Sequence, residues 1–496
     1  MSALRKLLSQ TAVYGLSTIV GRLLNYLLVP LYTYQFTDTA DYGMVGELYA
    51  YVSFLNILLT YGMETALFNF SRDESIRDKV YSTALLSLVG TSFLFLLPGL
   101  LLAEGGADWL GYPDKGEIIS AIIIILVTDA LCSIPFAKLR EQNKAGRFAF
   151  LKTLNILINI FINVFFLWFC KNEYDAVKGE ECSLSVWGAL YNPAIGIGYI
   201  FIANAIANLC TLALLLPSYL KVQLRFDSAI WKKMFRYALP LILVGLAGMV
   251  NETLDRVLIK YLVTTGDGLQ QVGIYGACYK IAILMTIFTQ AFRYAAEPFF
   301  FSHEKESDSR KTYSHVMTWF VIACSVIFLG TLMNLSWIQK FIGASYRSGL
   351  HVVPILLFAN ICLGIYFNLS IWYKLTGKTQ FGALLTLFGA AITIGINVAF
   401  IPKFGYVASA WATLACYAAM MVFSWLFGNK HFPVNYDLPR ILGYLLLSVA
   451  LYGVSRFIPA FGKIPDLVIS NALFVIFLGT VFMLEKNNLI TLFKKK

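Results

Sequence analysis

Charged side chains that interrupt long apolar stretches are the residues of this sequence best placed to do chemistry. An ionisable group inside such a stretch is costly to bury, so it usually faces a cavity or a partner. Cationic groups there can bind phosphate oxygens, because a guanidinium group offers paired N–H donors. Acidic groups can bind a proton or a cation. The candidates are Arg22, Asp129, Glu252, Asp255, Arg256, Lys260, Lys280 and Arg293.

Two interpretations are open for the charges near the middle of the chain. Glu252, Arg256 and Lys260 recur every four residues, so they lie on one helical face, where Glu252 can pair with Arg256 as a structural bridge. The acids Asp129, Glu252 and Asp255 can instead bind sodium ions or protons, because a carboxylate in an apolar environment titrates closer to neutral pH. As partners of the arginines they would not do so.

The composition indicates that these stretches are membrane spans. The chain has 496 residues, of which 58% are hydrophobic and 14% are charged, whereas a soluble protein carries roughly 25% charged residues. Its mean hydropathy is +0.69. We therefore expect an integral membrane protein. No segment between the apolar stretches is long enough to fold as a separate catalytic or nucleic-acid-binding domain.

Apolar windows of about 20 residues predict an all-α fold with fourteen transmembrane helices. The first window follows Arg5 and Lys6 and is too long for the core of a signal peptide, so we expect it to be the first span. The predicted spans cover residues 10–36, 42–69, 80–103, 117–138, 148–169, 194–216, 235–262, 270–299, 314–335, 350–372, 381–401, 405–427, 438–457 and 466–484.

The distribution of Lys and Arg predicts the orientation of the spans. These residues are concentrated in the even-numbered connections and at both ends of the chain. Because cytoplasmic loops are enriched in Lys and Arg, both termini are expected to be cytoplasmic. The net charge of +11 then reports topology and requires no nucleic-acid partner. The final run from Lys494 to Lys496 is expected to contact lipid head groups.

The second group of six spans repeats the first at offsets of 230 to 234 residues. The matching pairs are Gly43 with Gly273, Gly46 with Gly276, Arg22 with Arg256, Arg140 with Lys374, Lys144 with Lys378 and Asn163 with Asn397. Because six is an even number, both copies cross the membrane in the same direction, as in some alternating-access transporters. The predicted domains are an N-lobe at 1–220, a C-lobe at 221–430, and an appended helix pair with a basic tail at 431–496.

These features resemble the multidrug/oligosaccharidyl-lipid/polysaccharide (MOP) exporter superfamily. The resemblance rests on the plan of six, six and two spans, on Arg22 and Pro30 in the first span, on Gly43 and Gly46 in the second, and on Arg140 and Lys144 at the end of the fourth. Within the superfamily the chain is most similar to bacterial Wzx-type flippases of O-antigen and capsule repeat units.

The resemblance implies a substrate and a place in the cell. A flippase of this kind moves an undecaprenyl-diphosphate-linked oligosaccharide across the bacterial inner membrane by alternating access, while the lipid tail stays among the membrane lipids. A polysaccharide polymerase is an expected partner. The predicted diphosphate-binding residues are Arg22, Arg256, Lys280, Arg293 and Lys260. The predicted sugar contacts are Asn155, Asn159, Tyr49 and Tyr279, although amides in lipid more often join helices.

The sequence contains no P-loop, G-x-S-x-G or H-E-x-x-H motif, and its four histidines lack ligand spacing. We therefore expect a secondary transporter without a bound cofactor or metal, with Na⁺ or H⁺ as candidate coupling ions. The alternatives are a cation-coupled multidrug exporter, a lipid II flippase and a non-transporting subunit of a polysaccharide assembly complex. Cys170 and Cys182 are candidates for a disulfide bond on the outer side.

Overall fold

The computed structural model describes residues 19–176, 185–220, 225–303, 308–458 and 462–494. The described residues form helices joined by short connections, with no β-strand among them. Contacts between Cα atoms divide the chain into two compact units, Met1–Gly273 and Ile274–Lys496. The predicted boundaries after residues 220 and 430 remain predictions.

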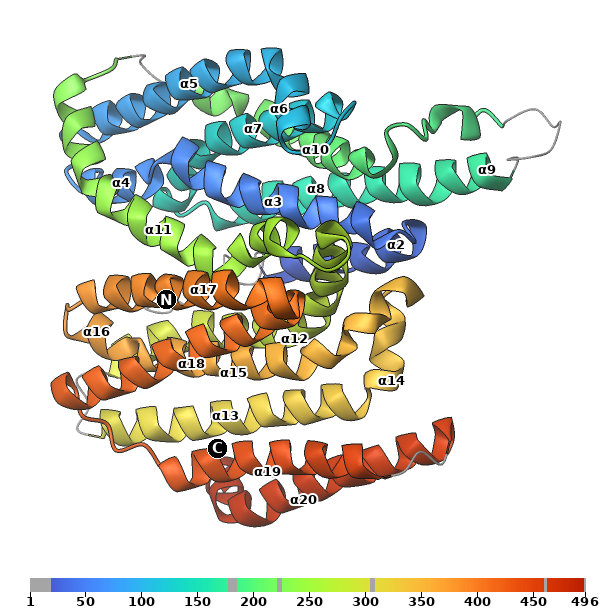
Figure 1. Cartoon of the computed structure of the whole chain (residues 1–496). Helices are drawn as coiled ribbons and strands as arrows, with labels where there is room; N and C mark the ends of the chain where they lie inside the picture. The colour runs from blue at the N-terminus through green and yellow to red at the C-terminus, as the bar shows by residue number, and fades with distance from the viewer. Residues whose placement is uncertain (1–18, 177–184, 221–224, 304–307, 459–461, 495–496) are drawn as a thin grey trace. The chain divides into compact units, whose positions relative to one another are not determined.

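Figure 1 labels the helices of both units. The first unit contains α2 (Leu28–Gln35), α3 (Thr39–Thr60), α4 (Met63–Phe70), α5 (Arg77–Leu101), α6 (Ala103–Trp109), α7 (Gly116–Glu141), α8 (Ala145–Val164), the π-helix η1 (Phe165–Cys170), α9 (Lys171–Ala176), the 3₁₀ turns η2 (Gly188–Leu190) and η3 (Gly196–Gly198), α10 (Tyr199–Leu220) and α11 (Ser228–Leu262). Helix α12 (Gly268–His303) crosses the boundary. The second unit continues with α13 (Ser309–Met333), α14 (Leu335–Ile338), the 3₁₀ segments η4 (Gln339–Phe341) and η5 (Ala344–Val352), α15 (Val353–Leu369), α16 (Ile371–Leu375), α17 (Gln380–Phe404), α18 (Tyr406–His431), α19 (Leu438–Phe457) and α20 (Lys463–Lys494).

The described residues include thirteen helices that are long and apolar enough to cross a membrane. They correspond one by one to the second through the fourteenth predicted spans, which confirms an all-α, multi-pass membrane fold. The first predicted span, 10–36, lies partly outside the described residues. Its described part is helical over residues 19–26 and again in α2.

Two breaks within predicted spans have local causes. Helix α2 begins just after a turn at Leu27, because Pro30 has no N–H to donate to the carbonyl of Tyr26 and its ring crowds that carbonyl. The second predicted span is divided into α3 and α4 by two consecutive left-handed residues, Tyr61 with φ of 32° and Gly62 with φ of 67°. Glycine adopts this conformation without steric cost, so the chain can change direction at Gly62.

The two units are built from similar helix pairs. In the first unit α7 packs against α5 and α10, and α8 packs against α10. In the second unit α15 packs against α13 and α18, and α17 packs against α18. These helices are the repeat equivalents of one another, so the sequence repeat has a counterpart in the packing. Helices α19 and α20 pack on α13.

Individual contacts also repeat. Asn163 and Asn397 are both fully buried, and each amide donates to the main-chain oxygen four residues earlier, Asn159 O at 2.8 Å and Thr393 O at 2.7 Å. Arg140 forms an ion pair with Glu64, and its repeat equivalent Lys374 forms one with Glu297 at 2.5 Å. The repeat therefore preserves both a packing amide and an ion pair between the second and fourth spans of each half.

Candidate functional site

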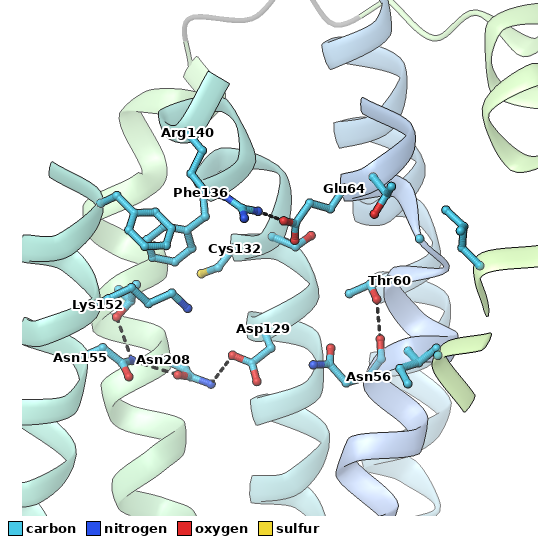
Figure 2. A pocket seen from close by; sticks show the side chains of 18 of the residues that line it. Asn56, Thr60, Glu64, Asp129, Cys132, Phe136, Arg140, Lys152, Asn155 and Asn208 are labelled. Carbon is cyan, nitrogen blue, oxygen red and sulfur yellow. Dashed lines mark hydrogen bonds and ion pairs between the residues drawn. The ribbon is translucent and has the colours of Figure 1, made fainter. Parts of the chain in front are cut away.

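A cavity of about 600 Å³ lies inside the first unit. Helices α3, α4, α7, α8, α10 and α11 each contribute residues to its wall. Most of the side chains in Figure 2 end in amide, hydroxyl or charged groups. A volume of this size is typical of sites for small molecules. Hydrogen-bonding groups that line a cavity inside apolar helices indicate a site for a polar ligand, because buried polar groups are costly without partners.

A chain of hydrogen bonds crosses three helices at the inner end of this cavity. Asn208 of α10 donates from Nδ2 to Oδ1 of Asp129 on α7 at 2.9 Å. Asn155 of α8 donates from Nδ2 to Oδ1 of Asn208 at 3.0 Å and to Oγ1 of Thr211 at 3.0 Å. An ionised carboxylate only accepts hydrogen bonds, so Asp129 fixes the orientation of the Asn208 amide, which in turn fixes Asn155.

On the opposite wall, Asn56 of α3 faces Asp129 across the cavity (Figure 2). The buried Oδ1 of Asn56 has no hydrogen-bond partner among the described residues. Within the same residues no hydrogen bond reaches Oδ2 of Asp129, whose Oδ1 accepts from Asn208. The inner end of the cavity therefore presents polar atoms from two facing helices to a ligand.

Charged groups line the other end of the cavity, which the charge distribution predicts to be cytoplasmic. Arg140 forms an ion pair with Glu64, and its guanidinium group lies 5.1 Å from the ring centre of Phe68. The ammonium group of Lys152 lies 4.4 Å from the ring centre of Phe136. With Asp129, the lining has two cations and two carboxylates, so its formal charge is balanced.

The sequence carries a signal for this cavity that the span analysis did not use. Asp129, Ser133, Phe136 and Arg140 are spaced so that they share one face of α7. Lys152 precedes Asn155 by three residues on α8 and shares its face. A search for polar residues at helical spacing would have connected these positions.

The structure gives Arg256 a partner on its own helix. Its Nη1 donates to Oδ1 of the buried Asp255 at 3.2 Å and to the main-chain oxygen of Glu252 at 2.8 Å. The pairing expected between Arg256 and Glu252 is therefore a contact with the backbone of Glu252, and the ion pair is with Asp255.

Lys260 lies in a buried cluster near the C-terminal end of α11, one turn beyond Arg256. Its ammonium group donates to Oε2 of Glu47 at 2.9 Å and to Leu110 O at 2.6 Å, and it lies 4.1 Å from the ring centre of Tyr112. Tyr112 also donates to Glu47. Burial and the neighbouring carboxylate raise the pKa of Tyr112, so it stays a neutral donor. Glu47 is fully buried. This cluster joins α3, α11 and the connection between α6 and α7.

The remaining predicted residues lie outside the cavity lining. Arg22 is exposed on the helical segment 19–26. Asn159 donates to Oδ1 of Asn25 at 3.4 Å, and Tyr49 accepts from Asn204 at 2.9 Å while stacking on Phe201. These contacts join helices.

In the second unit, Arg293 donates to Glu297 at 2.9 Å and lies 4.8 Å from the ring centre of Phe367. The ring of Tyr279 lies 6.0 Å from that of Tyr275, and Lys280 is half-buried on the same helix, α12. Cys182, one half of the predicted disulfide, lies outside the described residues.

Thirteen apolar helices among the described residues define a multi-pass membrane protein, and the polar cavity inside the first unit is its candidate binding site. The chain is similar to the solved structure of the lipid II flippase MurJ in an inward closed conformation, with a TM-score of 0.70 and 13% identity over 95% of this chain and 98% of that one. It is also similar to an inward-facing MATE-family transporter of the MOP superfamily, with a TM-score of 0.59 and 14% identity over 88% and 96% of the two chains. A MOP-superfamily transporter from Pyrococcus furiosus gives 0.52 and 13% over 89% and 96%. At these identities the likeness establishes the fold.

Residues 7–302 match the model of a family described as polysaccharide biosynthesis protein. The match covers more than half of the chain, so the chain belongs to the polysaccharide biosynthesis protein family. A comparison with curated proteins finds no match. The fold is that of solved transporters of the MOP superfamily, in agreement with the resemblance drawn from the sequence.

Proposed function

We propose that the protein is a flippase that moves an isoprenoid-diphosphate-linked oligosaccharide across the bacterial inner membrane by alternating access. The observation that carries the proposal is a polar, charge-balanced cavity inside a member of the polysaccharide biosynthesis protein family. A sugar needs many hydrogen-bonding partners and little net charge. An exporter of organic cations would instead favour an acidic, aromatic cavity. The MurJ structure, titled as a lipid II flippase, has the same fold.

The diphosphate needs a cationic site of its own. Arg22 and Arg256 occupy equivalent positions in the repeat, and guanidinium groups bind phosphate oxygens through paired hydrogen bonds. We propose these two residues as the principal ligands, supported by Lys280 and Arg293. Lys260 is the weakest of the five candidates because it already neutralises the buried Glu47.

Coupling to an ion is a separate part of the proposal. Asp255 holds Arg256, and the Glu252 side chain is exposed on the same helix, so a proton or Na⁺ that binds these carboxylates would weaken the hold on Arg256. Transport of the glycan lipid into proteoliposomes, with and without sodium and pH gradients, tests this coupling. A polysaccharide polymerase remains the proposed partner.

Thermal melting of the detergent-purified protein tests the proposed substrate. A ligand that binds only the folded state raises the melting midpoint. We expect undecaprenyl diphosphate to raise it in the wild type and in Arg456→Ala, a control that removes a charge from the appended pair. We expect no rise in the double variant Arg22→Ala/Arg256→Ala. A rise with cationic drugs and none with the lipid would refute the proposal in favour of a drug exporter.

A further inference from the structure

In the part of the second unit that the structure describes, the cavity beside the residues equivalent to the lining of the first unit's cavity is small. A cavity of only about 10 Å³ lies there, lined by Arg293, Glu297 and Phe367 among others. An offset of 234 residues relates the fourth and fifth spans to their equivalents in the second half of the repeat. At this offset Phe367 takes the place of Ser133. Its ring packs against the guanidinium group of Arg293 at 4.8 Å. An aromatic side chain thus occupies the second copy of the site.

Two polar residues that line the first cavity, Asp129 and Asn155, have no polar equivalent in the second copy. The same offset places Leu363 opposite Asp129 and Gly389 opposite Asn155. Each half does keep its ion pair, Arg140 with Glu64 in the first half and Lys374 with Glu297 in the second. The fold therefore needs the ion pair but does not need the carboxylate and amide. Since buried polar groups are costly, their presence in one half calls for a ligand there.

We propose that this cavity is a sugar-binding subsite that holds a neutral sugar ring of the transported lipid-linked oligosaccharide through Asp129, Asn155 and Asn56. The inference rests on the proposed function and assigns one part of the substrate to the first unit. Hydroxyl groups both donate and accept, so a sugar can donate to Oδ2 of Asp129 and to Oδ1 of Asn56. The bond from Asn208, whose amide is in turn held by Asn155, keeps Asp129 in place before the sugar arrives, which lowers the entropic cost of binding.

The same geometry argues against other occupants. A diphosphate carries several negative charges and needs a site with net positive charge, but this lining is balanced in charge, with Arg140 paired to Glu64. A single metal ion with its ligand shell would fill a small part of about 600 Å³. The cavity matches an uncharged molecule with many hydroxyl groups in both size and polarity.

Cys132 supplies a reporter inside the cavity, because its side chain belongs to the lining. The other seven of the eight cysteines are replaced by alanine, and transport is checked in cells. Alkylation of Cys132 by N-ethylmaleimide is then timed in proteoliposomes with undecaprenyl diphosphate, or with the glycan lipid purified from cells that make it. We expect the glycan lipid at ten times its Kd to slow alkylation about tenfold, because only the empty fraction reacts. Undecaprenyl diphosphate alone should not slow it.

Two variants separate sugar binding from other roles. Asp129→Asn keeps the shape of the side chain but removes its charge. It should raise the Kd of the glycan lipid about tenfold, the loss expected for a hydrogen bond to a charged group, so that the same concentration slows alkylation only about twofold. Asn471→Ala is the matched control, since Asn471 lies on α20 in the second unit and outside the cavity lining. It should leave protection unchanged, and both variants should keep the melting shift with undecaprenyl diphosphate.

Several results would overturn the inference. Equal protection by undecaprenyl diphosphate would place the diphosphate in the cavity, and protection by sodium ions alone would make it a cation site. If the glycan lipid is transported but leaves the rate of alkylation unchanged, the proposed function survives and the sugar subsite does not. If the protein neither transports nor binds either lipid, the proposed function fails, and the inference fails with it.

Discussion

Replacement of Lys260 by methionine is expected to destabilise the protein more than any other single loss of a charge discussed above. Glu47 has no exposed side-chain surface, and its Oε1 has no hydrogen-bond partner among the described residues. Lys260→Met therefore leaves a buried carboxylate with Tyr112 as its remaining donor. Removing one partner of a buried ion pair costs about 3–5 kcal/mol. Glu47→Gln should cost less, about 1–3 kcal/mol, because Lys260 keeps its bond to Leu110 O.

The free energy of unfolding of each variant, measured by denaturant titration in detergent micelles, tests this reasoning. The double variant Glu47→Gln/Lys260→Met should be more stable than Lys260→Met by about 2 kcal/mol, because no uncompensated charge remains. Lys171→Met is a control, since Lys171 pairs with the exposed Asp175 at 2.6 Å and such pairs contribute about 0–1 kcal/mol. A stable Lys260→Met variant that fails to bind undecaprenyl diphosphate would refute the structural role and make Lys260 a diphosphate ligand.

Two further predictions concern backbone packing and the appended pair. Gly43→Ala should lower the melting midpoint, because the new Cβ atom would lie 2.0 Å from Leu269 O. Gly248→Ala is the comparison, because no atom lies within 4 Å of its Cβ. This variant should stabilise α11 by about 0.5–1 kcal/mol. Melting curves of the two variants test this prediction. Equal midpoints would contradict the close approach of Gly43 to the main chain of Leu269. Arg440→Met should lower the free energy of unfolding by about 1–3 kcal/mol, because the side chain of its partner Glu485 is 1% exposed. Asp437→Asn should lower it by less than about 1 kcal/mol, as for other exposed ion pairs. Comparable losses of unfolding free energy in these two variants would count against burial as the cause.

The spans could be predicted from the sequence because each depends on a local average. A window of some twenty residues carries enough apolar side chains to identify a helix in lipid whatever its neighbours are. The breaks at Leu27 and at Tyr61 and Gly62 were harder to predict. Pro30 was visible as an interruption, but Tyr61 is not a residue type that usually adopts a left-handed conformation. Its position follows from the packing of α4 beside α11.

The candidate site was only partly predictable, because it depends on contacts between helices far apart in the chain. Asp129 and Asn155 stood out as polar residues in apolar stretches, and the structure places both in one cavity. Arg22, Lys280 and Tyr279 stood out in the same way, and they lie outside its lining. Polarity alone marks a residue as costly to bury. It does not say which other helix satisfies the residue.

The contacts of α11 with the first half bear on how access to the cavity could change. Lys260 binds Glu47 near the start of α3. Gly43 of α3 and Gly273 of α12 also lie very close together. A Cβ atom added to either glycine would lie within 2.0 Å of a main-chain oxygen of the other helix. These contacts lie at the end of the spans predicted to face outward, whereas Glu64 and Arg140 mark the other end of the cavity. An outward opening that parted α3 from α12 would separate these two glycines. Opening that also parted α11 from α3 would break the Lys260 ion pair and leave Glu47 uncompensated. We therefore expect α11 to move together with α3.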